Sequence, residues 1–219
     1  MIHKLEFDSL YLEFGLHRIL SSIYMSCSTG QVVGLLGRNG SGKSCLMKVV
    51  FGTMRAESKS VRINKAPLLD GYLKKRTISY LPQTDLLPPF FTFQKAIELY
   101  EIDSNDLIKE FPEAEFLLNR KSSEVSGGQR RILEVLLVLL SKHPFCILDE
   151  PFSGLAPIQI EKLKETIKRM KTEKGIIITD HLHRHIRDLA DELYVLSNGK
   201  TYRISEDEQL IKLGYLNEL

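Results

Sequence analysis

Short, continuously apolar runs separated by polar segments are the main pattern along the chain. Three runs, at 31–36, 145–148 and 175–179, contain almost no polar residues, which is typical of strands buried on both faces of a parallel sheet. Weaker strand signals occur at 5–8, 19–25, 60–64 and 77–81. The signals nearest the N-terminus predict an antiparallel edge region beside the buried strands.

Helical periodicity fills much of the remaining sequence. The segments with helical spacing are 93–119, 130–141, 158–171 and 183–190. Asn198-Gly199 separates two strand-like segments, at 192–197 and 200–204, and therefore predicts a hairpin. Buried strands that alternate with helices predict an α/β fold.

The composition is that of a globular protein with a sizeable core. The chain has 219 residues, 43% hydrophobic and 26% charged, with a net charge of +2 and three widely spaced cysteines that fit a reducing compartment. We expect a single domain over 1–219, with an α/β core at 1–84 and 144–219 and an inserted helical subdomain at 85–143. The longest apolar run is too short to cross a bilayer, and the first residues lack a signal-peptide pattern. Any membrane role would therefore require a partner chain.

A glycine-rich loop follows the first buried run. Its sequence, GRNGSGKS, comprises Gly37, Arg38, Asn39, Gly40, Ser41, Gly42, Lys43 and Ser44. Glycines let successive backbone N–H groups turn toward an anion, and the helix that follows adds the positive end of its dipole. Lys43 is suited to the β- and γ-phosphates, and Ser44 to Mg²⁺. An ordinary glycine turn would explain the glycines but not the Gly-Lys-Ser ending, so nucleotide binding is predicted.

Polar side chains follow three other predicted strands. Asp149 and Glu150 come directly after the second buried run, and ligands of parallel sheets bind beyond such strand ends. We expect Asp149 to bind Mg²⁺ and Glu150 to orient or deprotonate the attacking water; acids at a helix entry are the plainer alternative. His181 is expected to contact the γ-phosphate or the water, and Gln83 to contact Mg²⁺ or the water.

A second glycine pair opens the helix predicted at 130–141. Ser126 and Gln129 have capping-box spacing, which by itself indicates only a well-capped helix. Capping does not require Gly127 and Gly128, because each glycine inside a helix costs about 1 kcal/mol relative to alanine. Bare backbone at a helix N-terminus suits the close approach of an anion, so a second phosphate contact is predicted here.

Taken in order, these motifs resemble the nucleotide-binding domain of ATP-binding-cassette (ABC) proteins. The resemblance rests on GRNGSGKS, Gln83, VSGGQ at 125–129, CILDEP at 146–151 and His181, and it covers nearly the whole chain. It implies a P-loop NTPase core with an antiparallel β subdomain at its edge and a small inserted helical subdomain. It also implies ATP and Mg²⁺ as cofactors and ATP hydrolysis as the activity, with Lys43, Gln83, Glu150 and His181 catalytic and Ser44, Gln83 and Asp149 at the metal.

The resemblance further implies an assembly of several chains. Phe14 matches the aromatic residue that stacks on adenine, and Gln83 matches a hinge that faces the membrane partner. Ser126, Gly127 and Gly128, with Gln129, match a signature that contacts the ATP bound by a second ATP-binding subunit in a head-to-tail dimer, here expected to be a homodimer. Short segments at 152–158, 178–181 and 214–216 are similar to the lipopolysaccharide-export and branched-chain amino-acid-uptake ATPases.

The chain departs from the family pattern at several positions. Cys45 replaces a usual threonine that contacts phosphate, and we expect the helix dipole to lower the pKa of this thiol. Ala156 replaces a usual acidic residue where the two subunits communicate, and Val125 replaces a leucine. The short spacing from Gln83 to Ser126 indicates a compact helical subdomain. We nevertheless expect a working ATPase, in which hydrolysis is at most slow or the coupling between the two subunits of the dimer at most asymmetric.

The leading functional prediction is the ATP-hydrolysing subunit of an ABC transporter, bound to a transmembrane permease subunit on the cytoplasmic face of the membrane. One alternative is a soluble ABC ATPase of DNA repair or translation, which usually has two cassettes or a long insertion. Another is an ATP-binding regulator with weak hydrolysis, favoured by Cys45 and Ala156. The low net charge argues against nucleic acid, and the basic run 74–76 is explained by a solvated turn. Cargo and direction depend on the membrane partner.

Overall fold

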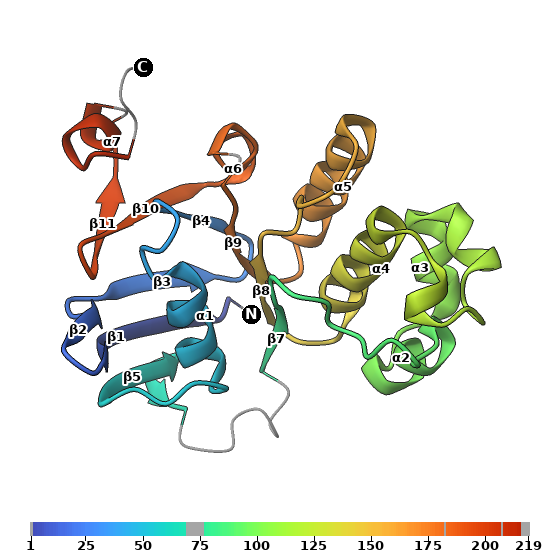
Figure 1. Cartoon of the computed structure of the whole chain (residues 1–219), viewed down its shortest axis with the longest axis horizontal. Coiled ribbons are helices and arrows are strands. Elements are labelled where there is room, and N and C mark those ends of the chain that lie inside the picture. The colour runs from blue at the N-terminus through green and yellow to red at the C-terminus, as the bar shows by residue number, and fades with distance from the viewer. Residues whose placement is uncertain (1, 69–76, 182, 207, 216–219) are drawn as a thin grey trace.

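The computed structural model describes residues 2–68, 77–181, 183–206 and 208–215. Two sheets occupy one side of the molecule, and a group of helices lies on the other side (Figure 1). The basic run 74–76 and the tail residue Leu216 lie outside the described residues.

A six-stranded sheet forms the centre of the α/β core, with the strand order β11-β10-β4-β9-β8-β7. Its strands are β4 (Val32–Leu36), β7 (Ile78–Leu81), β8 (Phe145–Asp149), β9 (Gly175–Thr179), β10 (Glu192–Ser197) and β11 (Lys200–Ile204). All neighbours are parallel except the hairpin of β10 and β11, which turns at Asn198 and Gly199. β4, β8 and β9 are buried at every position, which confirms the prediction from the three apolar runs.

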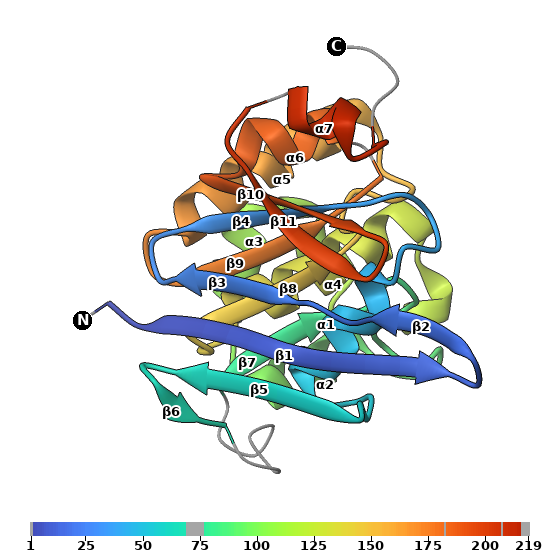
Figure 2. The ribbon, with the colours of Figure 1, turned by 90° about the vertical axis from the view of Figure 1, so that its left-hand side faces the viewer.

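An antiparallel sheet lies against one face of the core (Figure 2). It comprises β1 (Lys4–Phe14), β2 (His17–Leu20), β3 (Tyr24–Ser28), β5 (Ser58–Ile63) and β6 (Ala66–Pro67). The single strand expected at 19–25 is wrong, because the chain leaves β2 at Ser21 and re-enters the sheet at Tyr24. There the backbone N–H groups of Ser21 and Ser22 donate to the Gly199 carbonyl, which draws this segment toward the β10–β11 hairpin.

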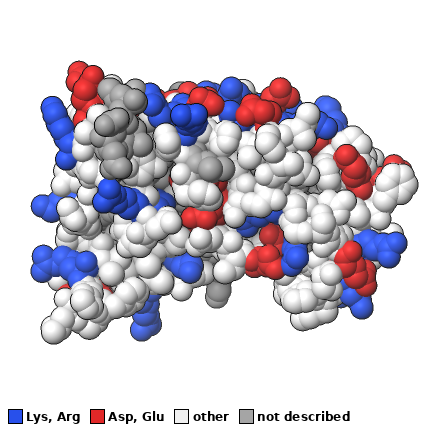
Figure 3. Space-filling model, turned by 45° about the horizontal axis from the view of Figure 1, so that its top comes forward, with Lys and Arg blue, Asp and Glu red and all other residues white. Residues whose placement is uncertain are grey.

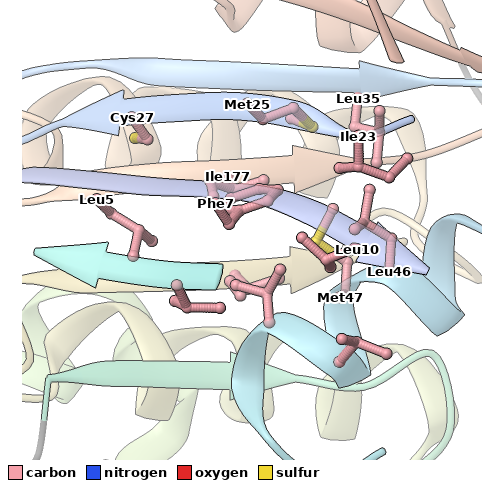
Figure 4. Packing of buried hydrophobic residues seen from close by; sticks show 14 of the residues in the cluster. Leu5, Phe7, Leu10, Ile23, Met25, Cys27, Leu35, Leu46, Met47 and Ile177 are labelled. Carbon is pink, nitrogen blue, oxygen red and sulfur yellow. The ribbon is translucent and has the colours of Figure 1, made fainter. Parts of the chain in front are cut away.

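The space between the two sheets is filled by apolar side chains and by α1 (Lys43–Phe51) (Figure 4). Leu5 and Phe7 of β1, Leu35 of β4 and Leu46 of α1 are fully buried there. This packing fixes the start of α1, and with it the glycine-rich loop, against the end of β4.

A second apolar core covers the opposite face of the six-stranded sheet. It is formed with α4 (Gly127–Leu140), α5 (Pro157–Met170), α6 (His183–Leu189) and α7 (Glu208–Lys212). The helices expected at 130–141, 158–171 and 183–190 are confirmed with shifted ends; α4 begins three residues earlier than Arg130, at the glycine pair. α7 and the short β6 were not predicted.

The helical segment beyond β7 has its own apolar core. It contains α2 (Phe93–Tyr100), α3 (Ser104–Glu110) and the 3₁₀ turns η2 (Pro112–Phe116) and η3 (Ser122–Glu124). The helical pattern at 93–119 is therefore interrupted: Glu101 ends α2 with φ 55°, Asp103 caps α3, and Pro112 starts a 3₁₀ turn. α4 contributes side chains both to this core and to the core under the sheet. The assignment of 85–143 as an inserted subdomain stays a prediction.

Candidate functional site

The glycine-rich loop joins β4 to α1 and requires glycine at two positions, one for lack of space and one for its backbone conformation. A Cβ atom at Gly37 would lie 2.6 Å from Ser41 Oγ and 2.8 Å from the Leu196 carbonyl oxygen. Gly42 has φ 101° and caps α1 in the left-handed region, where glycine is favoured. The loop is consequently wound tightly around the start of α1.

Lys43 lies inside this loop. Its Nζ atom donates to the carbonyl oxygens of Gly37 at 2.6 Å and Arg38 at 3.2 Å. Burial lowers the pKa of Lys43, while the carboxylates of Glu150, Asp149 and Asp180 oppose that shift. The ammonium group is therefore placed in the loop and faces a site of negative potential.

Asp149 is the last residue of β8 and is almost fully buried. The Tyr80 hydroxyl donates to its Oδ2 atom at 3.2 Å, and Oδ1 has no hydrogen-bond partner among the described residues. Burial raises the pKa of Asp149, and hydrogen bonding with Ser44 and Tyr80 acts in the opposite direction. A buried carboxylate oxygen without a partner suits a cation ligand.

Glu150 lies one residue further on and has a different environment. Its backbone has φ 53°, an uncommon conformation for a residue with a side chain, and its N–H donates to the Thr179 carbonyl at 2.7 Å. The Gln83 Nε2 atom donates to Glu150 Oε2 at 3.0 Å. His181 Nδ1 lies 3.7 Å from the same oxygen and 3.3 Å from Asp180 Oδ1. Three strand ends thus bring Gln83, Glu150 and His181 together.

These side chains surround a cavity of about 480 Å³, which we call the loop cavity. Its lining residues are Asn39, Gly40, Ser41, Gly42, Lys43, Ser44, Gln83, Glu150 and His181. A smaller cavity of about 290 Å³ shares Asn39, Gly40 and Ser41 with the loop cavity and is also lined by Arg18, Arg38 and parts of the β10–β11 hairpin. Phe14 is half exposed at the end of β1 and is not among the described lining residues of either cavity.

The prediction for Cys45 is wrong. Its side chain packs partly against the core under α1, and burial raises the pKa of the thiol instead of lowering it. Loss of hydration outweighs the favourable helix dipole at this position. Cys45 is therefore a partly buried side chain packed at the edge of that core.

The second glycine pair lies outside the loop cavity. Ser126 caps α4: Gln129 N–H donates to Ser126 Oγ at 3.3 Å, and Ser126 N–H donates to Gln129 Oε1 at 3.2 Å. A Cβ atom at Gly127 would meet no atom within 4 Å, whereas one at Gly128 would lie 3.5 Å from the Gly154 carbonyl oxygen. The capping box is confirmed, and the backbone at Gly127 faces open space.

Several residues near the site were missed by the sequence analysis. Tyr80 contacts Asp149, and the Asp180 carboxylate accepts a hydrogen bond from the Phe152 N–H at 3.3 Å. Arg131 and Glu134 are buried on α4 beside Glu150 and segment 82–87, which we call the Gln83 loop. Arg131 and Glu134 could have been noticed in the sequence, because these two charged residues, three positions apart, interrupt an otherwise apolar helix.

The buried parallel strands, the glycine-rich loop before α1 and the acids at the end of β8 define a nucleotide-binding protein of the P-loop NTPase class. Residues 20–153, more than half of the chain, match the family model described as ABC transporter. The chain belongs to the ABC transporter family.

Similar proteins agree with this assignment. The chain is 27% identical over 232 residues to the lipopolysaccharide export system ATP-binding protein LptB of Haemophilus influenzae, covering 96% of both chains. It is 26% identical over 209 residues to the high-affinity branched-chain amino acid transport ATP-binding protein BraG of Pseudomonas aeruginosa, covering 90% of both. A solved ATP-binding subunit of an ABC transporter superposes with a TM-score of 0.84 at 27% identity, covering 96% of this chain and 93% of the other.

The family and the fold predicted from sequence are therefore confirmed, as is the leading prediction of an ATP-binding subunit of an ABC transporter. The comparisons do not support the alternative of a DNA-repair or translation ATPase. In the described part of the chain, every helix is too short or too polar to span a bilayer.

Proposed function

We propose that this chain hydrolyses Mg²⁺-ATP and thereby drives a separate transmembrane permease subunit. The observation that carries the proposal is the convergence of Lys43, Gln83, Glu150 and His181 on one cavity beside a glycine-rich loop. Lys43 supplies a cation for phosphate. Gln83, Glu150 and His181 supply groups that bind and deprotonate water.

Phosphate binding is assigned to the whole loop, from Gly37 to Ser44. Its backbone N–H groups and the N-terminus of α1 favour an anion, and Lys43 exchanges its carbonyl contacts for phosphate oxygens. The smaller neighbouring cavity beside Arg38 extends the site along the loop. Adenine stacking is assigned to Phe14, which is exposed and therefore accessible.

The residues at the end of β8 fit Mg²⁺, a cation that takes few protein oxygens and keeps phosphate and water ligands. Asp149 Oδ1 is buried without a hydrogen-bond partner among the described residues, and the Ser44 hydroxyl interacts with the Asp149 carboxyl group. Asp149 and Ser44 would hold the ion, with Gln83 as a further oxygen ligand. Bound Mg²⁺ would neutralise phosphate charge.

Hydrolysis is assigned to Glu150. Its carboxylate accepts a proton from the attacking water while Gln83, 3.0 Å away, fixes the orientation of that carboxylate. His181 lies on the same side of the cavity and contacts the γ-phosphate or the water. The left-handed backbone at Glu150 and its hydrogen bond to Thr179 give this residue a different setting from that of Asp149, which supports separate roles for the two acids.

A second copy of the chain is proposed to complete the site. Ser126, Gly127, Gly128 and Gln129 lie outside the loop cavity, and Gly127 faces open space. In a head-to-tail homodimer, this helix start contacts the ATP held by the partner's loop. The resemblance to ABC proteins and the exposed, bare backbone support this assignment.

The permease is proposed to dock at an apolar groove of about 610 Å³ between α1, β7 and α2. Its lining includes Phe51, Tyr80, Pro82, Leu99 and Tyr100, and it adjoins Gln83 in sequence. On the face shown in Figure 3, acidic and basic residues are interspersed among the described residues and do not form the basic stripe expected for nucleic acid. A membrane-docked chain of this kind acts at the cytoplasmic surface.

Comparison of the wild type with Glu150→Gln tests the hydrolysis proposal. We expect the substitution to lower kcat by about 10²- to 10⁴-fold, the range for loss of a general base. ATP binding survives, so the variant accumulates as an ATP-bound dimer in size-exclusion chromatography. Glu165→Gln, an exposed acid on α5, is the matched control and keeps wild-type turnover.

The measurement is made on the purified chain and on the complex recovered from solubilised membranes. Wild-type turnover no higher than that of Glu150→Gln in both preparations would refute hydrolysis. Recovery of ribosomes or DNA-repair factors instead of a membrane protein would refute the transport role.

A further inference from the structure

Two charged side chains are buried on α4, one helical turn after the glycine pair. Arg131 is 7% exposed and Glu134 is 0% exposed, although α4 is otherwise apolar along this face. Removing charges from water is costly unless they are paired and hydrogen-bonded. Their partners therefore indicate why these charges lie there.

Arg131 joins two of the strand ends that form the loop cavity. Its Nη1 atom donates to the Pro82 carbonyl oxygen at 2.9 Å. Its Nη2 atom donates to the carbonyl oxygens of Asp149 at 2.7 Å and Glu150 at 2.9 Å. One guanidinium group thus contacts the residue before Gln83 and the backbone of both site acids.

Glu134 contacts the other end of the Gln83 loop. Its Oε1 atom accepts hydrogen bonds from the backbone N–H groups of Leu86 at 2.9 Å and Leu87 at 3.1 Å. Its Oε2 atom lies 3.8 Å from Arg131 Nη1, which makes the two residues an ion pair. Segment 82–87 is therefore bound at both ends by one turn of α4.

We propose that Arg131 and Glu134 are positioning residues for hydrolysis. They fix Gln83 and Glu150 to the helix whose N-terminus carries Gly127, so movement of that helix resets the 3.0 Å contact between Gln83 and Glu150. The inference rests on the proposed ATPase function. α4 packs against β7 and β8, as Figure 1 shows, so this connection is short.

A purely structural role makes a different prediction. If the pair only satisfied buried polar groups, substitutions would reduce stability but leave the turnover of folded protein unchanged. A positioning role changes kcat while ATP affinity stays the same, because loss of about 1 Å of alignment can cost about 10²-fold in rate.

The test uses Arg131→Lys, Glu134→Leu and Glu134→Gln. We expect a fall in kcat of about 10- to 100-fold for Arg131→Lys and Glu134→Leu, with ATP Kd within about threefold of wild type. Lysine has one terminal nitrogen, whereas Arg131 contacts Pro82 and Glu150 through two different nitrogen atoms. Glu134→Gln keeps the oxygen that accepts from Leu86 and Leu87 and is expected to retain most of kcat.

The matched control is Val61→Ala, which truncates a buried residue of β5 in the antiparallel sheet, outside the loop cavity and segment 82–87. It lowers stability without changing the kcat of the folded fraction. Equal kcat losses in this control and in Glu134→Leu, at equal stability loss, would overturn the proposal.

Coupling to Gln83 is a second measurement. If Glu134 acts through the Gln83 loop, Gln83→Ala and Glu134→Leu together cost no more than the larger single effect. Effects that multiply would overturn the proposal, because they would show that the two residues act independently.

Amide hydrogen exchange separates this inference from the proposed function. Glu134→Leu is expected to accelerate exchange in segment 82–87, whereas Glu134→Gln and Val61→Ala leave it at the wild-type rate. Absence of any wild-type ATPase activity would refute the proposed function, and unchanged exchange in Glu134→Leu would refute the positioning role. Normal wild-type turnover with unaltered kcat in both Arg131→Lys and Glu134→Leu would refute the positioning role alone.

Discussion

The chain has two glycine-containing helix starts, and their surroundings differ sharply. Residues 39–44, where the glycine-rich loop runs into α1, line a cavity together with Gln83, Glu150 and His181. The start of α4 at 126–128 has a capping box instead, and the backbone at Gly127 faces open space. Both starts present N–H groups suited to an anion, but they are placed in different electrostatic settings.

The difference indicates which part of a nucleotide site each helix provides. At α1, a cation and several water-binding groups are already assembled within the chain. At α4, the local hydrogen bonds of Ser126 and Gln129 are satisfied by each other, so the helix start itself needs no further partner for stability. We infer that α1 binds ATP in each chain and that α4 acts on the ATP of a second chain.

The largest effect is expected at α1. Lys43→Met removes a buried cation at the phosphates, and truncation of a buried charged partner costs about 2–5 kcal/mol, or about 30- to 4000-fold in ATP affinity. Fluorescent-nucleotide titration measures Kd. Lys48→Met, further along the same helix, is the control with unaltered Kd. Unaltered affinity in Lys43→Met would contradict the placement of the phosphates.

At α4 we expect the converse result. Gly127→Val blocks the close approach of a partner's phosphate and lowers kcat by about 10²-fold, similar to the loss of one transition-state donor. Space around Gly127 is open, so the substituted chain folds, and ATP Kd of the isolated chain stays at the wild-type value. Steady-state hydrolysis and nucleotide titration together check this split between kcat and Kd.

Mixing these two variants tests the comparison directly. A head-to-tail dimer of Lys43→Met with Gly127→Val contains one site with an intact loop and an intact α4 start. The mixture is therefore expected to regain part of the wild-type turnover that neither variant shows alone. If both glycine segments served the same chain's ATP, mixing would restore nothing.

The sequence was most informative where a residue acts close to its own strand. The continuously apolar runs predicted β4, β8 and β9, because burial on both faces removes polar residues. Glu150 and His181 were found because they follow β8 and β9 within two residues. Gln83 was found because it follows the weaker strand signal at 77–81, and Lys43 because it lies in the glycine-rich loop after β4. These positions depend on local order along the chain.

Predictions failed where distant segments decide the outcome. The break between β2 and β3 depends on hydrogen bonds from Ser21 and Ser22 to the hairpin residue Gly199. The pKa of Cys45 depends on packing that no local pattern shows. Arg131 and Glu134 were visible as charges in an apolar helix, but their partners in 82–87 and 149–150 are set by the tertiary fold.

A smaller effect is expected from Asp149, the buried acid at the end of β8. Burial raises the pKa of Asp149 above its unfolded value, so the unfolded chain binds fewer protons between the two pKa values and stability falls as pH rises through that window. Asp149→Asn removes this loss. Above both pKa values, the substitution stabilises the chain without nucleotide by about 1.4 kcal/mol for each unit by which folding raises the pKa of Asp149.

Thermal unfolding with and without nucleotide measures this effect. At neutral pH we expect a higher Tm for Asp149→Asn than for wild type in the absence of nucleotide. The added protection that Mg²⁺ gives ATP-bound wild type should be missing in the variant. A lower nucleotide-free Tm would show that Asp149 contributes favourable structural contacts that outweigh the cost of its buried charge.

The smallest effect concerns Cys45, directly after the glycine-rich loop. Cys45→Thr adds a hydroxyl at the N-terminal end of α1, and one more hydrogen bond to phosphate is worth about 0.5–1.5 kcal/mol, or about two- to tenfold in ATP affinity. Cys45→Val has the same shape without the hydroxyl and is expected to keep wild-type Kd. An equal increase in ATP affinity in both variants would assign the gain to packing under α1, where the Cys45 thiol lies. The side chain at position 45 would then make no contact with phosphate, and phosphate would be bound through residues 37–44 alone.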